Sequence, residues 1–178
     1  MAKLALLRPG QTALLVIDVQ RALFTRPNPL FNAYKVVETI NALVARAQLF
    51  GARVVYIQHE NDSILVKGSD GWKLHPEMKP KPTDLSLYKK QGNAFLGTTL
   101  QSDLEARGVQ NLLITGLVTQ GCVRATSLGG LERGYNVFLV QGAHSNYNVD
   151  AESFIEKQEA ELKEAGVHLV TPGQIDFN

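Results

Sequence analysis

The sequence has a single cysteine, Cys122, among 178 residues. An intrachain disulfide is therefore impossible, which excludes the small secreted scaffolds that depend on several bridges. No apolar stretch reaches the roughly 20 residues that a membrane-spanning helix needs. The first residues, MAKLALLRPG, lack the apolar run and the cleavage signature of a signal peptide. We therefore expect a cytoplasmic protein with no membrane partner.

A strong excess of charge is also missing, because 18 Lys and Arg residues stand against 17 Asp and Glu residues. The basic residues are scattered, so nucleic acid is not an expected partner. Neither a GxxxxGK[ST] loop nor a GxGxxG loop follows a strand-like run, so the usual phosphate-binding loops are absent. The four histidines show no HxH, HExxH or HxxxH spacing. We expect no metal ion and no cofactor.

What the sequence does contain is a recurring unit, in which a polar, helix-like segment ends in glycine and an apolar run follows. Glycine is typical of helix C-terminal caps, where the left-handed backbone costs it little. The apolar runs are continuous rather than alternating, which is typical of parallel strands covered on both faces. The units are Gly51 before VVYIQ, Gly108 before NLLIT, Gly134 before NVFLV and Gly166 before VHLV, and an earlier run, TALLVID, adds a first strand.

The segments between these runs carry apolar residues at helical spacing. The first stripe consists of Val36, Val37, Ile40, Leu43, Val44 and Ala47. Strands that alternate with helices predict right-handed crossovers and a three-layer α/β/α architecture with a doubly wound, mostly parallel sheet. We expect residues 1–178 to form this architecture as a single domain. The interval from residue 51 to 108 is longer than the others and contains three prolines, at 76, 80 and 82, which argue against a long regular element. An insertion of this length is usually functional.

Ligands of an open parallel sheet bind outside the carboxyl ends of its strands, so the residues that leave each strand are the candidates. Asp18 follows ALLVI, where its carboxylate is partly desolvated unless it caps a helix or a loop. Cys122 follows a strand and a glycine-containing turn. We expect it to open a helix, whose N–H groups and dipole favour the thiolate; a small buried side chain is the alternative. Lys89 and Lys90 lie in the insertion, and the alternative for each is an ordinary surface charge.

Three segments, LLVIDVQ, YKKQGNAF and LLITGLVTQGCVRAT, make residues 11–172 resemble the isochorismatase-like cysteine hydrolases. The resemblance implies the fold predicted above and a catalytic triad of Asp18, Lys89 and Cys122. The family's lysine precedes a Ser-Ala-Phe-like segment, which selects Lys89 over Lys90, although Asn93 stands in place of serine. The segment around the nucleophile matches Gly-x-x-Thr-x-x-Cys-Val at Gly116, Thr119, Cys122 and Val123.

The same resemblance implies a non-proline cis peptide between Leu117 and Val118, and an oxyanion hole formed by the backbone N–H groups of Val118 and Cys122. It also implies a homo-oligomer. Some members of the family bind a metal through an Asp-x-His pair after the second strand. His59 and Asn61 stand at those positions here, so we expect that metal site to be missing.

The implied activity is hydrolysis of a small-molecule amide, or a related C–N bond, through a thioester. Asp18 acts as the base, and Lys89 lowers the thiol pKa. The alternatives are a vinyl-ether hydrolase of the isochorismatase type, a redox protein that uses Cys122, and a non-catalytic binding protein on the same fold. Candidate pocket residues, each also a candidate for packing, are Gln20, Phe24, Trp72 and Tyr88. Trp72 and His75 are also candidates for a lid or a subunit contact.

Overall fold

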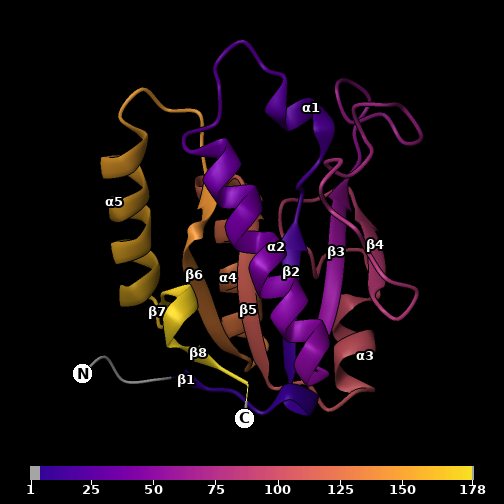
Figure 1. Cartoon of the computed structure of the whole chain (residues 1–178), viewed down its shortest axis with the longest axis vertical. Coiled ribbons are helices and arrows are strands. Elements are labelled where there is room, and N and C mark those ends of the chain that lie inside the picture. Colours follow the sequence, from indigo (N-terminus) through magenta and orange to yellow (C-terminus); the bar gives the residue numbers. More distant parts are fainter. Residues whose placement is uncertain (1–4, 178) are drawn as a thin grey trace.

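The computed structural model describes residues 5–177. Its centre is a six-stranded sheet in the order β4-β3-β2-β5-β6-β7, in which every neighbouring pair is parallel (Figure 1). This confirms the predicted fold class. The strands are β2 (Thr12–Ile17), β3 (Arg53–His59), β4 (Leu85–Lys89), β5 (Asn111–Leu117), β6 (Asn136–Ser145) and β7 (His168–Val170). A separate pair joins β1 (Ala5–Leu6) to β8 (Ile175–Asp176) in parallel.

Helices cover both faces of the six-stranded sheet. In Figure 1, α2 (Ala33–Phe50) crosses in front of the strands and α4 (Arg124–Glu132) lies behind them. α3 (Leu100–Glu105) and α5 (Ala151–Glu164) add apolar side chains to the core on the α4 face. The short helix α1 (Arg21–Phe24) follows β2, and single turns of 3-10 helix occur at Pro9–Gln11 and Pro172–Gln174.

The apolar stripe of α2 forms one core layer with the sheet. All six residues of the predicted stripe are buried, and they pack with Leu14, Val16 and Val54 of β2 and β3. An apolar face of this width is what fixes a helix on a sheet. Gly51 ends α2 in the left-handed conformation, with φ at 81°, and its N–H donates to the carbonyl of Ala47. The glycine cap predicted at this position is therefore present.

Two local features differ from the sequence expectation. β4 lies inside the long insertion, where no strand was predicted, and it extends the sheet by pairing with β3. Cys122 does not open α4, because the helix begins at Arg124. Cys122 instead lies in a preceding π-helical turn, Thr119–Val123, in which Gly121 has non-helical angles (φ −104°, ψ −112°).

The strand order reverses between β2 and β5, which are neighbours at the centre of the sheet. In doubly wound sheets, the carboxyl ends of the strands on either side of this reversal form the binding crevice. In Figure 1 these ends lie at the upper edge of the sheet, close to α1 and the long insertion.

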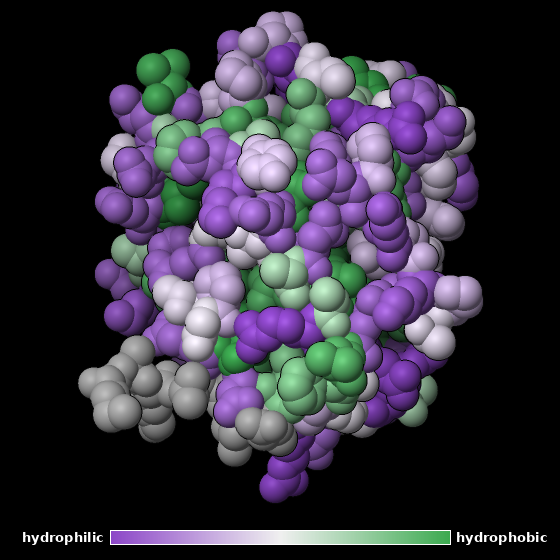
Figure 2. All heavy atoms as spheres, in the orientation of Figure 1, coloured by the Kyte–Doolittle hydropathy of each residue, from purple (hydrophilic) through white to green (hydrophobic). Residues whose placement is uncertain are grey.

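The face that carries α2 is mostly hydrophilic, as Figure 2 shows. A compact hydrophobic patch lies at the C-terminal end of α2, where Leu49 and Phe50 are exposed (Figure 2). Within residues 5–177, no helix combines the length and the apolar character that crossing a bilayer requires.

Candidate active site

Asp18, Lys89 and Cys122 meet at the carboxyl edge of the sheet, although they lie far apart in the chain. The Lys89 Nζ atom is 3.0 Å from Asp18 Oδ2 and 3.1 Å from Cys122 Sγ. The side chains of Lys89 and Asp18 are buried, at 0% and 4% exposure, whereas Cys122 is partly exposed. A cation, a carboxylate and a thiol that solvent reaches only in part therefore form one cluster.

The end of β2 holds Asp18 in an unusual backbone conformation. Its φ of 53° lies in the left-handed region, which a non-glycine residue adopts only where its surroundings enforce it. The Asp18 N–H donates to the carbonyl of Ile57, and the Asp18 carbonyl accepts from the N–H of Gln20, both at 2.8 Å. Neighbouring β3 and the following turn thus fix the direction of the carboxylate.

Gly116 lets β5 approach this bend. It pairs with Ile17, and a Cβ atom at Gly116 would lie 2.0 Å from the Ile17 carbonyl oxygen. Only glycine fits here, which explains why the sequence has one immediately before the loop that leads to Cys122. The peptide bond between Leu117 and Val118 is cis, and the carbonyl of Val118 then accepts from the N–H of Gly121 at 3.0 Å.

Lys89 is the last residue of β4, and the alternation of a strand points it inward while the preceding Tyr88 points outward. Besides the carboxylate and the thiol, its ammonium contacts His59 Nδ1 and donates to the carbonyl of Gln91, each at 3.1 Å. Four polar partners surround a group that has three hydrogens. The buried charge is therefore fully satisfied.

The electrostatics of the cluster favour a neutral thiol at rest. Burial raises the pKa of the Asp18 carboxyl above its usual value, although Lys89 and a hydrogen bond from Cys122 oppose the change. Burial and the Asp18 carboxylate raise the pKa of the Cys122 thiol to about 12, and Lys89 offsets only part of this. The sequence led us to expect a lowered thiol pKa, and that expectation is wrong for the free site. The thiol instead donates a hydrogen bond to Asp18.

His59 is the member of this cluster that sequence reasoning missed. It ends β3, and the sequence indicated no catalytic role for it beyond its place at a strand end and at the missing metal-binding pair. Burial and the nearby Lys89 ammonium lower its pKa, so the ring is neutral near pH 7. Because an ammonium can only donate, Nδ1 must accept the hydrogen bond from Lys89, and the ring hydrogen lies on Nε2. Its place at the end of a predicted strand was the only signal in the sequence, and it has no distinctive spacing to the other residues of the cluster.

The donor set does not fit a metal ion. One ligand atom each from Asp18, His59 and Cys122 lie within 4.8 Å of one another. The Lys89 ammonium, however, contacts all three side chains, so the cluster already holds a cation. Asn61 Oδ1 accepts from the backbone N–H groups of Ser63 and Leu65, and it serves the local turn.

The candidate pocket residues differ in their surroundings. Gln20 is fully buried, and its side chain links β3 to the insertion: Nε2 donates to the carbonyls of His59 and Trp72, and Oε1 accepts from the His59 N–H. Phe24 packs on the ring of His75 at 4.5 Å. The Gln20 side chain thus links the end of β3 to the insertion through buried hydrogen bonds.

Trp72 and Tyr88 form a ring pair with centroids 5.2 Å apart. Trp72 packs in a small apolar cluster with Leu117 and Val118, which places it next to the loop that leads to Cys122. Tyr88 is 43% exposed.

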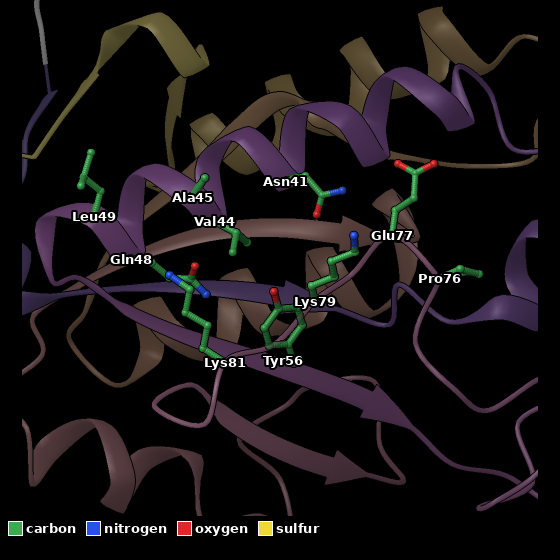
Figure 3. A pocket seen from close by; sticks show the side chains of 10 residues that line it. All are labelled: Asn41, Val44, Ala45, Gln48, Leu49, Tyr56, Pro76, Glu77, Lys79 and Lys81. Atoms are coloured by element: carbon green, nitrogen blue, oxygen red, sulfur yellow. The ribbon is translucent and has the colours of Figure 1, made fainter.

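A large cavity lies elsewhere. It measures about 850 Å³ and runs between α2 and residues 76–81, with Tyr56 at its floor (Figure 3). In Figure 3, Asn41 of α2 faces Lys79 across it, and Gln48 of α2 lies beside Lys81. None of its lining residues belongs to the Asp18–Lys89–Cys122 cluster. Chemistry rather than cavity size therefore locates the candidate active site.

Known proteins resemble this chain over most of its length. Residues 12–169 match the isochorismatase domain family. A streptothricin hydrolase of Streptomyces noursei is 35% identical over 141 residues, which cover 78% of this chain and 51% of that protein. Ureidoacrylate amidohydrolase RutB of Methylorubrum extorquens is 31% identical over 172 residues, which cover 75% of this chain and 69% of RutB. The chain therefore spans about half the length of the streptothricin hydrolase and about two thirds of RutB.

The fold is also found among solved structures. A cysteine hydrolase from Pseudomonas syringae pv. phaseolicola superposes with a TM-score of 0.88, covering 98% of this chain and 96% of that one. The two sequences are 20% identical, so this likeness concerns the fold alone.

Proposed function

The chain belongs to the isochorismatase family, and on that premise we propose that it is a cysteine-dependent hydrolase of a small amide or a related C–N bond. One observation carries the proposal: a single buried ammonium, that of Lys89, lies 3.0 Å from the carboxylate of Asp18 and 3.1 Å from the sulfur of Cys122. A base next to a nucleophile, both oriented by a third group, is the general arrangement for covalent catalysis.

Acylation starts from the neutral thiol. As the Cys122 sulfur forms a bond to the substrate carbonyl carbon, the thiol proton moves to Asp18. The raised pKa of the Asp18 carboxyl suits it to hold this proton. Lys89 stabilises the negative charge throughout, and the backbone N–H groups of Val118 and Cys122 bind the oxyanion. The C–N bond then breaks, and the leaving amine takes the proton from Asp18.

Deacylation repeats the same proton transfer with water. Asp18 removes a proton from a water molecule, whose oxygen attacks the thioester carbonyl. The C–S bond breaks, the acid leaves, and the sulfur regains the proton from Asp18. The site is thereby restored with one water consumed, and the protein residues alone supply the acid, the base and the nucleophile.

The names of the relatives guide the choice of substrates. Streptothricin hydrolase and ureidoacrylate amidohydrolase, 35% and 31% identical to this chain, make amides and ureido compounds the first to test. The vinyl-ether and redox alternatives lack a comparable observation. A redox role would use a second, resolving cysteine, and the sequence has a single cysteine.

The test is a panel that includes streptothricin, ureidoacrylate and simple primary amides, assayed for release of amine or ammonia. Cys122→Ala should keep the parent melting temperature and lose turnover by about 10⁴-fold or more. Mass spectrometry after an acid quench should find the acyl group on the peptide that contains Cys122.

Other outcomes would point elsewhere. Turnover of a substrate by Cys122→Ala at the parent rate would refute the nucleophile and support the vinyl-ether alternative. A sulfenic acid or mixed disulfide at Cys122, without an acyl adduct, would support the redox alternative.

A further inference from the structure

A buried chain of polar side chains runs from the loop that leads to Cys122 to α5. The Thr119 hydroxyl lies 2.9 Å from His144 Nδ1, and His144 Nε2 lies 3.2 Å from Glu159 Oε1. Gln141 Nε2 donates to the other carboxylate oxygen of Glu159 at 2.7 Å. None of these residues takes part in the reaction proposed above.

An irregularity in β6 brings His144 to this position. Ile114 of β5 pairs with Leu139, yet Gly116 pairs with His144, so β6 has four residues, 140–143, opposite the single residue 115 of β5. Gly142 has a φ of 76° within this bulge. Bulges near active sites commonly redirect a side chain. Here the bulge places His144 next to the end of β5, where the residues that carry the proposed oxyanion hole begin.

Burial and charge fix the direction of the hydrogen bonds. Thr119 is fully buried, and the His144 side chain is 0% exposed. Burial favours a raised pKa for Glu159, but hydrogen bonds from His144 and Gln141 bring that pKa below its usual value. The carboxylate can only accept, so the His144 ring hydrogen belongs on Nε2, although this N–H is not well aligned with Glu159. In the tautomer that carries its hydrogen on Nε2, Nδ1 accepts a hydrogen bond from the Thr119 hydroxyl.

We propose that His144, held by Glu159, is a positioning residue that fixes Thr119 and through it the oxyanion-binding turn of residues 118–122. Thr119 follows Val118 directly, so anchoring its side chain restricts the backbone that carries the Val118 N–H. Thr119 itself has no exposed surface, so its proposed role is to position the turn. The proposal rests on the proposed function, because the turn matters only if an oxyanion forms at Cys122.

The test compares Thr119→Val, which keeps the shape and removes the hydroxyl, with Thr119→Ser, which keeps the hydroxyl. A misplaced oxyanion donor is expected to lower kcat by about 10–100-fold with little change in KM, since a lost donor costs up to about 10³-fold. Acetaldehyde and benzaldehyde, which add to the thiol and place their oxygen in the oxyanion hole, should bind to Thr119→Val more weakly by a similar factor. Thr119→Ser should restore both properties.

Alkylation of Cys122 by iodoacetamide separates positioning from general damage. The rate of this alkylation depends on the Asp18–Lys89–Cys122 cluster, so Thr119→Val should be alkylated at the parent rate. Thr115→Val is the matched control, because Thr115 is also a fully buried residue of this segment whose hydroxyl donates to the Leu15 carbonyl at 2.9 Å. It should lower the melting temperature and leave aldehyde affinity unchanged.

Three results would overturn the proposal: parental kcat and aldehyde affinity in Thr119→Val, a matching loss of alkylation rate, or no rescue by Thr119→Ser. Failure of the proposed function looks different, because the parent itself would then neither hydrolyse amides nor bind the aldehydes. Amide hydrogen exchange at residues 119–122 would still report on the turn, with faster exchange expected in Thr119→Val and parental exchange refuting the anchoring role.

Discussion

Lys89 is the residue whose removal should affect stability and activity together. Lys89→Met keeps the length of the side chain and removes an ammonium that contacts Asp18, His59, Gln91 and Cys122. Asp18 then lacks its counter-charge, and it must either stay ionised in a buried site or take up a proton, which also costs free energy near neutral pH. Breaking a buried ion pair by removing one partner costs about 3–5 kcal/mol, and we expect a loss of unfolding free energy in this range near neutral pH.

The cost should depend on pH in a defined direction. The pKa of Asp18 is raised by burial in the folded protein, and Lys89 is the group that most opposes this rise. Without Lys89 the folded-state pKa rises further above the unfolded value of 3.8. A group with a raised folded-state pKa contributes stability that is present below its unfolded pKa and is lost as pH rises through the folded-state pKa. The defect of Lys89→Met should therefore be larger at pH 8 than at pH 5.

Urea unfolding followed by circular dichroism at both pH values measures this effect. Lys90→Met is the matched control, because the neighbouring Lys90 side chain is 77% exposed and lies 3.7 Å from Glu60. Its effect should stay within about 0.5 kcal/mol. The double variant Asp18→Asn/Lys89→Met should recover part of the lost stability, because the uncompensated charge is gone.

Activity provides the second readout. Lys89→Met should lose turnover, because a protonated Asp18 cannot accept the thiol proton. If Lys89→Met equals Lys90→Met in stability at pH 8 and retains turnover, the buried cluster does not work as described.

Two further predictions follow from the same region. Nitrogen-15 NMR should find His59 Nδ1 without a hydrogen and the ring titrating below the reference pKa of 6.5; the midpoint should rise in Lys89→Met, since the ammonium lowers it. If the His59 titration midpoint were the same in Lys89→Met as in the parent, the contact between Lys89 Nζ and His59 Nδ1 would be refuted. Gly116→Ala, at φ 112° and against the Ile17 carbonyl, should lower the unfolding free energy by about 2–5 kcal/mol in urea titrations. Gly173→Ala, with open space around it, is the control and should stay near the parent value.

Most strands and helices could be predicted from the sequence because local features, namely apolar runs and glycine caps, specify them. The runs VVYIQ, NLLIT and NVFLV lie within β3, β5 and β6, and Gly51 ends α2 as its position before a strand predicted. Continuous apolar runs can be buried only in a sheet covered on both faces. β4 escaped prediction, since LSLYK alternates between exposed and buried residues at the edge of the sheet and follows a proline-rich stretch.

The candidate site was readable in part. The resemblance selected Asp18, Lys89 and Cys122, and the structure brings these side chains within contact distance. The sequence did not indicate that His59 joins them, since a lone histidine after a strand has no distinctive spacing. It also led to the wrong direction for the thiol pKa, because the helix expected to begin at Cys122 begins at Arg124 and burial dominates.

The sequence by itself determined most of the strands and helices of the core, β4 excepted, and several side chains that leave the strands at the reactive edge, because those choices depend on neighbours along the chain. Tertiary structure alone decided the chemical state of the site. Lys89 and Asp18 are 71 positions apart, and the pKa values of Asp18 and Cys122 depend on how deeply the fold buries them together. The same holds for Thr119 and His144, which meet only because β6 bulges against the end of β5.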